Sequence, residues 1–274
     1  MYASRLTAVT VSAFMLTAGS AVMSESASAA VTNYVALGDS YSSGTGAGSY
    51  DPGAGACSRS ANAYPKKWAA ANSPDSFKFV ACSGATTSTV TSGQLGALSS
   101  STTFVSITVG GNDAGFGKVM EACVLRSTAS CESAVKKAEG FMEDTLPGRL
   151  DTLYGKIRSR ASSARVVVLG YPRLYLKNSA GCVGLNQTKR NVLNRAADTL
   201  NTSIEKSVAR AGFVFSDVRD DFSGHELCSG DGWLNAVTFP IGDSYHPTAR
   251  GHAKGYLPAL KSAVRRSLAL RQDS

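Results

Sequence analysis

Short apolar runs alternate with longer helical segments along most of this chain. The runs expected to be strands span residues 34–37, 77–81, 104–109, 165–169 and 213–216. Several are apolar at nearly every position, as expected of parallel strands that helices cover on both faces. The intervening stretches have helical period or composition, over residues 61–71, 92–98, 132–162, 187–211 and 248–270. This alternation predicts a three-layer α/β/α fold around a central parallel sheet of about five strands.

The first thirty residues differ in composition from the rest. Arg5 precedes an Ala- and Val-rich stretch, and small residues follow at 27–30, which is the pattern of a secretory signal peptide. The apolar run is too short and too often interrupted to predict a membrane span. We therefore expect residues 1–30 to be a signal peptide and residues 31–274 to form one domain. The expected protein is secreted, extracellular and monomeric, without a stable membrane anchor.

All six cysteines lie after the predicted signal peptide, and an even count in a secreted chain favours three disulfides. We expect sequential pairing because each bond then pins one long loop: Cys57–Cys82, Cys123–Cys131 and Cys182–Cys228. There is no C-x-x-C motif, and no cysteine has a histidine at zinc-ligand spacing. We therefore expect no metal site.

The formal net charge of +8 is spread along helical segments in which acidic residues alternate with basic ones. Such interleaving is typical of solvated helix faces. It argues against nucleic acid as a partner and is compatible with a mild preference for anionic lipid or substrate.

The first predicted strand ends in Gly38-Asp39-Ser40, in the stretch VALGDSYSSG. These residues favour turns, but the carboxyl end of a parallel strand is also where open α/β sheets bind ligands. A nucleophilic serine needs a base, and the chain has three histidines. His225 lies in a Gly-rich loop and His252 in a helical run, whereas His246 precedes Pro247 at a helix start. His246 is therefore the candidate base.

An acyl-transfer reaction also needs donors for the oxyanion that forms in its transition state. The second predicted strand ends in ACSGATT, where Gly84 offers an unobstructed backbone N–H. The third ends in VGGND, where Asn112 carries a side-chain amide. Serine, glycine and asparagine thus follow three successive strands.

These residues occur in four blocks, GDSYSSG, ACSGATT, GGND and DSYHP, which resemble those of the SGNH superfamily, also called GDSL hydrolases. With its signal peptide and cysteines, the chain looks most like the secreted actinobacterial GDSL lipases. The resemblance implies the flavodoxin-like SGNH fold, Ser40 as nucleophile and His246 as base. It also implies an oxyanion hole formed by the N–H groups of Ser40 and Gly84 with the Asn112 amide. No cofactor is implied.

The group that orients His246 has two candidates. Asp243, three residues upstream, matches the family's Asp-x-x-His pattern, and a charged acceptor stabilises an imidazolium better than a neutral one. The alternative is the main-chain carbonyl of Ser244. We expect Asp243 to fill this role, and we assign Asp39 and Asp113 to loop structure.

The resemblance implies lipase, phospholipase or general esterase activity on triacylglycerols, phospholipids or other fatty acyl esters. Without a membrane anchor, the enzyme is expected to meet its substrate in the medium or at a lipid–water interface. The Gly-rich loops 44–60 and 222–241 are expected to wall the cleft without a bulky lid. One alternative is a carbohydrate acetylesterase, which would need sugar-stacking aromatics; Trp68 and Trp233 are equally explained by core packing. Another is an inert secreted binding module.

Overall fold

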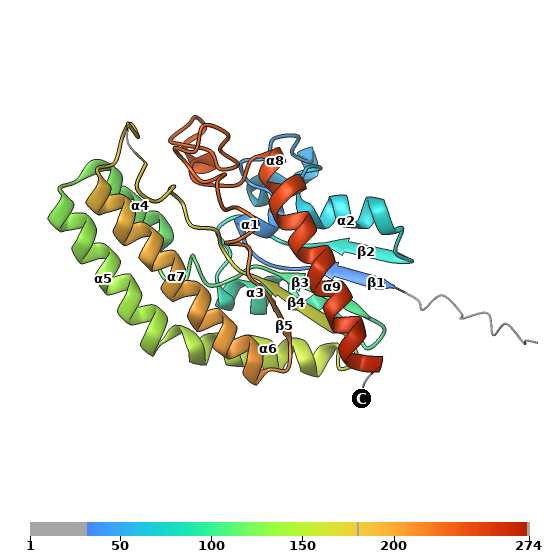
Figure 1. Ribbon diagram of the computed structural model, residues 1–274. Coiled ribbons are helices and arrows are strands. Elements are labelled where there is room, and N and C mark those ends of the chain that lie inside the picture. The colour runs from blue at the N-terminus through green and yellow to red at the C-terminus, as the bar shows by residue number, and fades with distance from the viewer. Residues whose placement is uncertain (1–31, 180, 273–274) are drawn as a thin grey trace, which may run out of the picture. The chain divides into compact units, whose positions relative to one another are not determined.

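One parallel sheet forms the centre of the protein. The computed structural model describes residues 32–179 and 181–272, so the predicted signal peptide lies outside the described residues. The strands are β1 (Asn33–Ala36), β2 (Ser76–Phe79), β3 (Phe104–Ile107), β4 (Arg165–Leu169) and β5 (Val214–Ser216). Every neighbouring pair is parallel, and the spatial order is β2-β1-β3-β4-β5 (Figure 1). The predicted five-stranded parallel sheet is confirmed.

The strand order contains a switch point beside β1. From β1 the chain moves to β2 on one side and then crosses to β3 on the other. Crossovers that leave in opposite directions open a crevice at the carboxyl ends of the two central strands. Ser40 follows β1 and Asn112 follows β3, so both lie at this crevice.

Helices cover both faces of the sheet. They are α1 (Ser40–Ser43), α2 (Tyr64–Asn72), α3 (Thr87–Gly93), α4 (Phe116–Leu125), α5 (Thr128–Asp144), α6 (Leu146–Arg160), α7 (Gln187–Arg210), α8 (Ala249–Gly251) and α9 (Leu257–Gln272). Helix α9 packs against β4, β5 and α2, while α6 packs against α3 and α7 on the other side (Figure 1). The described residues, 32–179 and 181–272, belong to one compact unit. None of the helices described here is both long enough and apolar enough to cross a membrane.

Among the differences between the observed and the predicted helices, three concern α3, α4 and α6. The expected helix over 132–162 is two helices, α5 and α6. Pro147 lies in the first turn of α6, where backbone N–H groups have no acceptor within the helix, so the proline removes no helical hydrogen bond. Helix α3 begins before 92 because Thr86 and Thr89 form a capping box. Helix α4 was not predicted; it begins after Gly115, which has a left-handed backbone and no side-chain cap.

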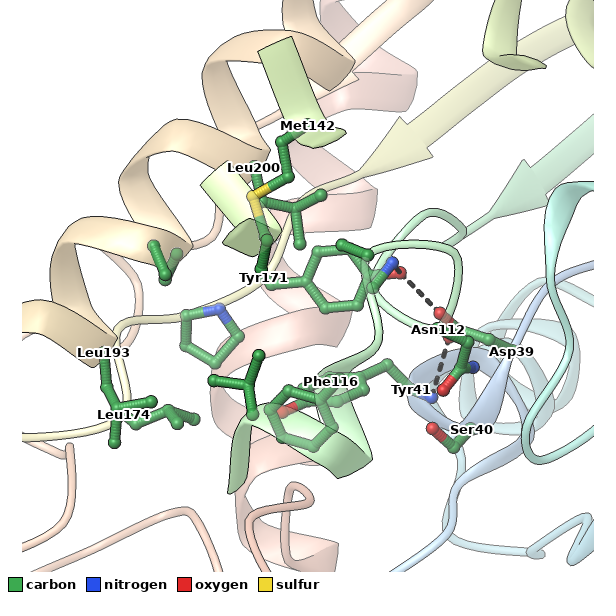
Figure 2. Close-up of a pocket in the computed structure, with 17 residues that line it drawn as sticks. Asp39, Ser40, Tyr41, Asn112, Phe116, Met142, Tyr171, Leu174, Leu193 and Leu200 are labelled. Atoms are coloured by element: carbon green, nitrogen blue, oxygen red, sulfur yellow. Dashed lines mark hydrogen bonds between the residues drawn. The ribbon is translucent and has the colours of Figure 1, made fainter. Parts of the chain in front are cut away.

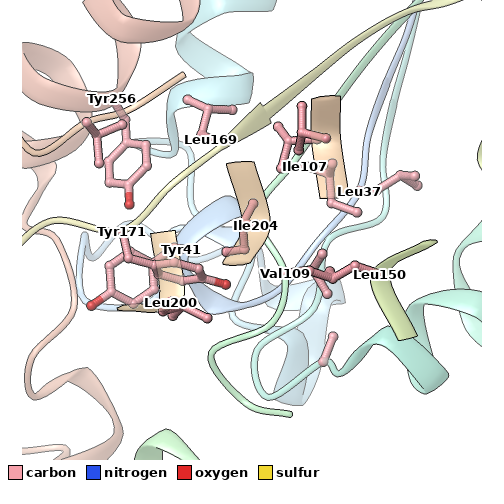
Figure 3. Close-up of a cluster of buried hydrophobic side chains, with 14 of the residues drawn as sticks. Leu37, Tyr41, Ile107, Val109, Leu150, Leu169, Tyr171, Leu200, Ile204 and Tyr256 are labelled. Carbon is pink, nitrogen blue, oxygen red and sulfur yellow. The ribbon is translucent and has the colours of Figure 1, made fainter. Parts of the chain in front are cut away.

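The three central strands are almost wholly buried, as their apolar runs predicted. Figure 3 shows Leu37, Ile107 and Leu169 of the sheet among side chains of the covering helices such as Leu150 and Ile204. Burial of such aliphatic side chains stabilises the fold by about 1.5–3 kcal/mol each relative to exposure. Trp68 is part of this core, where it packs edge-on against Tyr34. Its position gives no support to a sugar-stacking role.

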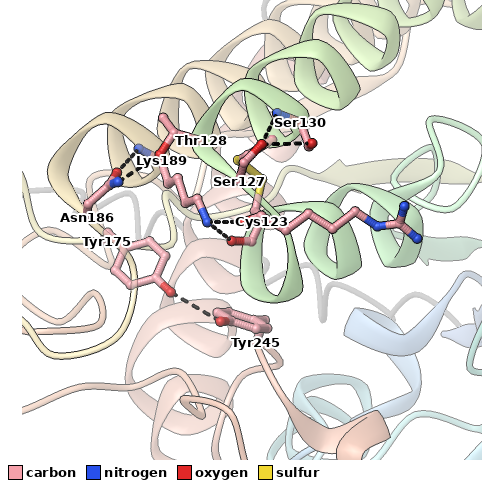
Figure 4. The surroundings of a disulfide bond; sticks show 10 residues. Cys123, Ser127, Thr128, Ser130, Tyr175, Asn186, Lys189 and Tyr245 are labelled. Carbon is pink, nitrogen blue, oxygen red and sulfur yellow. Dashed lines mark hydrogen bonds between the residues drawn. A yellow bond between two sulfur atoms is a disulfide. The ribbon is translucent and has the colours of Figure 1, made fainter.

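Three disulfides are present, and they join the sequentially paired cysteines. Cys57–Cys82 ties the loop after α1 to the end of β2, and Cys182–Cys228 ties the two long loops of the second half of the chain together. Cys123–Cys131 joins α4 to α5 (Figure 4). Beside it, the Lys189 ammonium donates to the carbonyls of Cys123 (2.8 Å) and Arg126 (2.6 Å). A cation at these carbonyls fixes the carboxyl end of α4.

Candidate active site

The turn after β1 presents Ser40 at the start of the short helix α1. Asp39 caps this helix, since its carboxylate accepts from the backbone N–H of Tyr41 at 3.0 Å. Gly38 has φ +123°, and a Cβ there would lie 2.5 Å from the carbonyl oxygen of Thr108, so only glycine fits. The Gln94 side chain bonds both the N–H and the carbonyl of Gly38, each at 2.8 Å. The backbone that carries Ser40 is therefore held from several directions.

The Asp39 carboxylate lies at the centre of a buried network. Besides the Tyr41 N–H, it accepts from the Thr108 hydroxyl at 2.6 Å and from the Tyr171 hydroxyl. Tyr171 in turn accepts from the N–H of Gly111 at 3.3 Å. Burial raises the pKa of Asp39 to about 6, although these hydrogen bonds work against that shift. Through Asp39 and Tyr171, the turn that carries Ser40 is tied to the loop that carries Asn112.

His246 lies directly beside Ser40. Its Nε2 is 2.8 Å from the Ser40 Oγ, and its Nδ1 is 3.1 Å from the carbonyl oxygen of Ser244. Because Nδ1 donates to that carbonyl, Nε2 carries the lone pair that faces the serine hydroxyl. Burial lowers the pKa of His246 to about 4, against the opposing effects of the Ser244 carbonyl and the Asp243 charge. The imidazole is therefore neutral at neutral pH and able to accept a proton.

Asp243 does not occupy the position that we expected. Residues 243–246 form a tight turn closed by the His246 N–H on the Asp243 carbonyl (3.3 Å), with Tyr245 at φ +64°. This turn brings the Ser244 carbonyl to the imidazole. The Asp243 carboxylate instead accepts from the Tyr50 hydroxyl at 2.8 Å, and Tyr50 accepts from the Gly46 N–H at 2.8 Å. The expectation that Asp243 orients His246 is corrected accordingly, in favour of the main-chain alternative.

The two further oxyanion candidates line the same cleft as Ser40 and His246. Gly84 has φ +78° and follows the Cys57–Cys82 disulfide by two residues, which anchors its turn. Asn112 donates one amide hydrogen to the Ala85 carbonyl at 3.0 Å. Its second N–H remains for another acceptor, because a side-chain amide carries two.

The other candidate residues have structural contacts elsewhere. His225 stacks on Trp233 with ring centroids 3.7 Å apart, and the buried His252 accepts from the Tyr64 N–H at 3.3 Å. Asp113 accepts from the N–H and the hydroxyl of Thr87, at 2.9 and 2.6 Å. Within residues 32–179 and 181–272, no group of three His, Cys, Asp or Glu side chains is placed to hold a metal ion.

An apolar pocket extends from Ser40 into the protein. Ser40 and Asn112 lie at one end, and the walls come from α4, α5, α7 and the segment after β4. Figure 2 shows Phe116, Met142 and Leu200 among these walls. The wall residues beyond the polar end are almost entirely aliphatic or aromatic. Such a lining suits a hydrocarbon chain attached to the group that Ser40 contacts.

Comparison with known proteins gives a consistent result. The model of the GDSL-like lipase/acylhydrolase family matches residues 36–254. Lipase 1 of Streptomyces coelicolor is 54% identical over 247 residues, which cover 90% of this chain and 92% of that protein. Crystal structures of phospholipase A1 from Streptomyces albidoflavus NA297 (57% identity) and of an extracellular lipase from Streptomyces rimosus (52%) each superpose with a TM-score of 0.84. Each alignment covers 85% of this chain and all of the other chain.

The chain belongs to the GDSL-like lipase/acylhydrolase family. Membership confirms the predictions of the SGNH fold and of a lipid ester hydrolase of this family.

The residues that support the site of this GDSL hydrolase were not predicted from the sequence. Gln94, Thr108 and Tyr171 hold the nucleophile turn, yet they lie 54 to 131 positions from Ser40 in the chain. Tyr41 is adjacent to Ser40, and its hydroxyl donates to the Tyr245 carbonyl at 2.7 Å. Only the position of Thr108, at the end of a predicted strand, could have indicated a contact with the serine block.

Proposed function

We propose that this GDSL hydrolase cleaves fatty acyl esters of lipids through an acyl-enzyme on Ser40. The observation that carries the proposal is the 2.8 Å contact between Ser40 Oγ and His246 Nε2 at the open end of an apolar pocket. His246 takes the hydroxyl proton as Ser40 Oγ attacks the ester carbonyl, and it returns that proton to the departing alcohol. Water then attacks the acyl-enzyme, again with His246 as base, and releases the fatty acid.

The oxyanion of each tetrahedral intermediate would accept hydrogen bonds from the N–H groups of Ser40 and Gly84 and from the Asn112 amide. All three residues line the cleft that also contains His246. Donors that are already in place before the reaction cost no reorganisation when negative charge develops. This assignment follows the residues that the sequence singled out.

We assign the orientation of His246 to the Ser244 carbonyl. A carbonyl oxygen that accepts the Nδ1 hydrogen selects the tautomer whose Nε2 is a base, which is the role that the aspartate has in a Ser-His-Asp triad. Asp243 then acts through its charge alone, which raises the pKa of His246 and so favours the imidazolium. Its contribution is smaller than that of a directly bonded carboxylate.

The apolar lining of the pocket favours a hydrocarbon acyl chain over an acetyl group. A carbohydrate acetylesterase needs only a small acyl site, whereas apolar side chains of three helices line this pocket beyond Ser40. The names of the relatives, lipases and a phospholipase A1, agree with a lipid substrate. We extend the proposal to secretion after removal of residues 1–30, because three disulfides are present and the Streptomyces rimosus relative is described as extracellular. Residues 31–274 would act as one monomeric domain.

Hydrolysis of a nitrophenyl ester series from acetyl to palmitoyl, together with phosphatidylcholine and an acetylated sugar, tests this function. We expect turnover of medium and long acyl esters and of phosphatidylcholine, and loss of all turnover in Ser40→Ala with an unchanged melting temperature. Turnover of acetyl esters alone would favour the acetylesterase. Absence of turnover on every substrate would favour the inert binding module and contradict the proposal.

A further inference from the structure

The described part of the chain exposes six large apolar side chains. They are Tyr50, Leu125, Val183, Val237, Phe239 and Ile241. Phe239 and Val183 are 94% and 95% exposed, and Leu125 is 75% exposed. Single exposed apolar residues are ordinary on a protein surface and are expected to be scattered over it. Here three of the six line the cleft that contains Ser40 and His246, and the other three lie on segments that are adjacent in the chain to that cleft or are linked to it by a hydrogen bond or a disulfide.

Three of the six line the catalytic cleft itself. Leu125, Val237 and Ile241 share that cleft with Ser40 and His246. These exposed side chains therefore line the cleft through which an ester would reach Ser40.

The remaining residues are linked to the same entrance. Tyr50 donates to Asp243 in the histidine turn, and Phe239 lies between the cleft residues Val237 and Ile241. Val183 follows Cys182, whose disulfide to Cys228 fixes it to the loop that leads to these residues. We call Leu125, Val183, Val237, Phe239 and Ile241 the apolar rim.

The segments that carry the apolar rim are held by specific bonds. The N–H of Thr238 donates to the Ser244 hydroxyl at 2.9 Å, and that hydroxyl donates back to the Thr238 carbonyl at 3.2 Å. At Leu125, the end of α4 is fixed by the Cys123–Cys131 disulfide and by the Lys189 ammonium (Figure 4). These bonds fix the backbone that carries the rim side chains. Less conformational entropy is therefore lost when the side chains are buried against a partner.

We propose that the apolar rim inserts into the acyl layer of an aggregated lipid surface and so places the catalytic cleft over its substrate. The proposal rests on the proposed function, because it takes the substrate to be a lipid ester. A protein that covered the rim would close the entrance to Ser40, whereas a lipid surface both buries these side chains and supplies the ester. Insertion by apolar contact also predicts binding to uncharged surfaces that does not depend on ionic strength.

Cosedimentation with vesicles of ether-linked phosphatidylcholine tests the proposal. These lipids contain no carboxylic ester bond, so binding is measured separately from acyl-ester hydrolysis. We expect the wild-type protein to bind, Phe239→Ser to lower the partition coefficient about tenfold, and Val183→Ser to lower it several-fold, because each removes apolar area from the membrane. Phe239→Leu is the matched control, and it should stay within about threefold of wild type because it keeps most of that area.

Failure of the wild-type protein to bind, equal binding by all variants, or binding that is lost at high salt would each overturn the proposal. A loss of binding in Phe239→Leu as large as that in Phe239→Ser would overturn it too, since it would indicate recognition of an aromatic ring rather than apolar insertion. If the vesicle result is as expected but no ester is hydrolysed, the surface assignment stands and the proposed function fails.

Discussion

Two turns meet where Ser40 contacts His246, and they are built in different ways. The turn after β1, residues 38–43, is enclosed by the protein, and Asp39 within it is 1% exposed. The turn over residues 241–246 begins at the surface, where Ile241 is 70% exposed, and enters the protein only at its end. A turn that continues a buried strand has its neighbours fixed by the sheet. A surface turn takes its conformation from whichever loop lies against it.

The difference appears in the two carboxylates that precede Ser40 and His246 in the chain. Asp39 accepts three hydrogen bonds from groups that the sheet and α1 bring to it. Asp243 accepts from Tyr50, on a loop almost two hundred residues earlier in the chain. The first carboxylate therefore holds the nucleophile turn, and the second joins two surface loops.

The largest expected effect comes from the imidazole that both turns position. His246→Ala removes the only base within reach of Ser40 in the described part of the chain, and we expect kcat on a soluble nitrophenyl ester to fall at least about a thousandfold. The melting temperature serves as the folding control. A loss smaller than about tenfold would mean that another group deprotonates Ser40.

The contributions of the two turns to the free energy of unfolding should change with pH in opposite directions. The pKa of Asp39 is raised from 3.8 to about 6, so the folded state binds the extra proton, and this stabilisation, present at low pH, is lost as the pH rises through about 6. The pKa of His246 is lowered from 6.5 to about 4, so its contribution is present above pH 6.5 and is lost as the pH falls through about 4. Each amounts to about 3 kcal/mol.

Unfolding free energies of the wild-type protein, Asp39→Asn and His246→Gln, measured between pH 4 and pH 8, separate these contributions. The difference between wild type and Asp39→Asn should change mainly between the unfolded and folded pKa values of Asp39, 3.8 and about 6. The His246→Gln difference should change with the opposite sign between about 4 and 6.5. If the two differences in unfolding free energy changed with pH in the same direction, the expected electrostatic contrast between the turns would be wrong.

Truncation of the buried carboxylate is expected to cost both stability and activity. Asp39→Ala leaves the Tyr171 and Thr108 hydroxyls and the Tyr41 N–H without their acceptor, which should lower the free energy of unfolding by about 2 kcal/mol. Displacement of Ser40 should lower kcat about tenfold with little change in KM. Denaturant titration and steady-state kinetics measure both. Wild-type kcat in a destabilised variant would mean that the network supports the fold but does not position Ser40.

The smallest effect should come from the exposed turn. Asp243→Asn removes the charge but keeps an acceptor for Tyr50, and the Ser244 carbonyl still orients His246. We expect kcat/KM within about threefold of wild type, in keeping with a partly solvated charge. A loss equal to that of His246→Ala would show that Asp243 bonds the imidazole during the reaction.

Much of the fold could be predicted because the strands are short apolar runs that end in turn residues. All five predicted strands lie within two residues of β1 to β5 at each end. The helices were harder to place. Helix α4 starts without a capping side chain, and the break before α6 depends on Pro147, a signal that the long helical pattern of residues 132–162 obscured.

At the site, the sequence could identify groups attached to strand ends but not the direction of side chains in loops. Ser40 and Asn112 follow β1 and β3, so sheet geometry alone brings them together. The orientation of Asp243 depends on Tyr50 and on the left-handed backbone of Tyr245, a conformation for which a tyrosine gives no local signal. The position of Ser40 was therefore predictable from the buried turn, while the acceptor for the His246 Nδ1 hydrogen was not predictable from the exposed one.

Covalent labelling tests the central claim most directly. An alkyl fluorophosphonate reacts with a serine that a neighbouring base activates, and it forms a stable adduct in place of the acyl-enzyme. We expect intact-mass analysis to show a single adduct, peptide mapping to locate it on Ser40, and both Ser40→Ala and His246→Ala to abolish it. An adduct on another residue, or an unlabelled protein that still hydrolyses esters, would contradict the account.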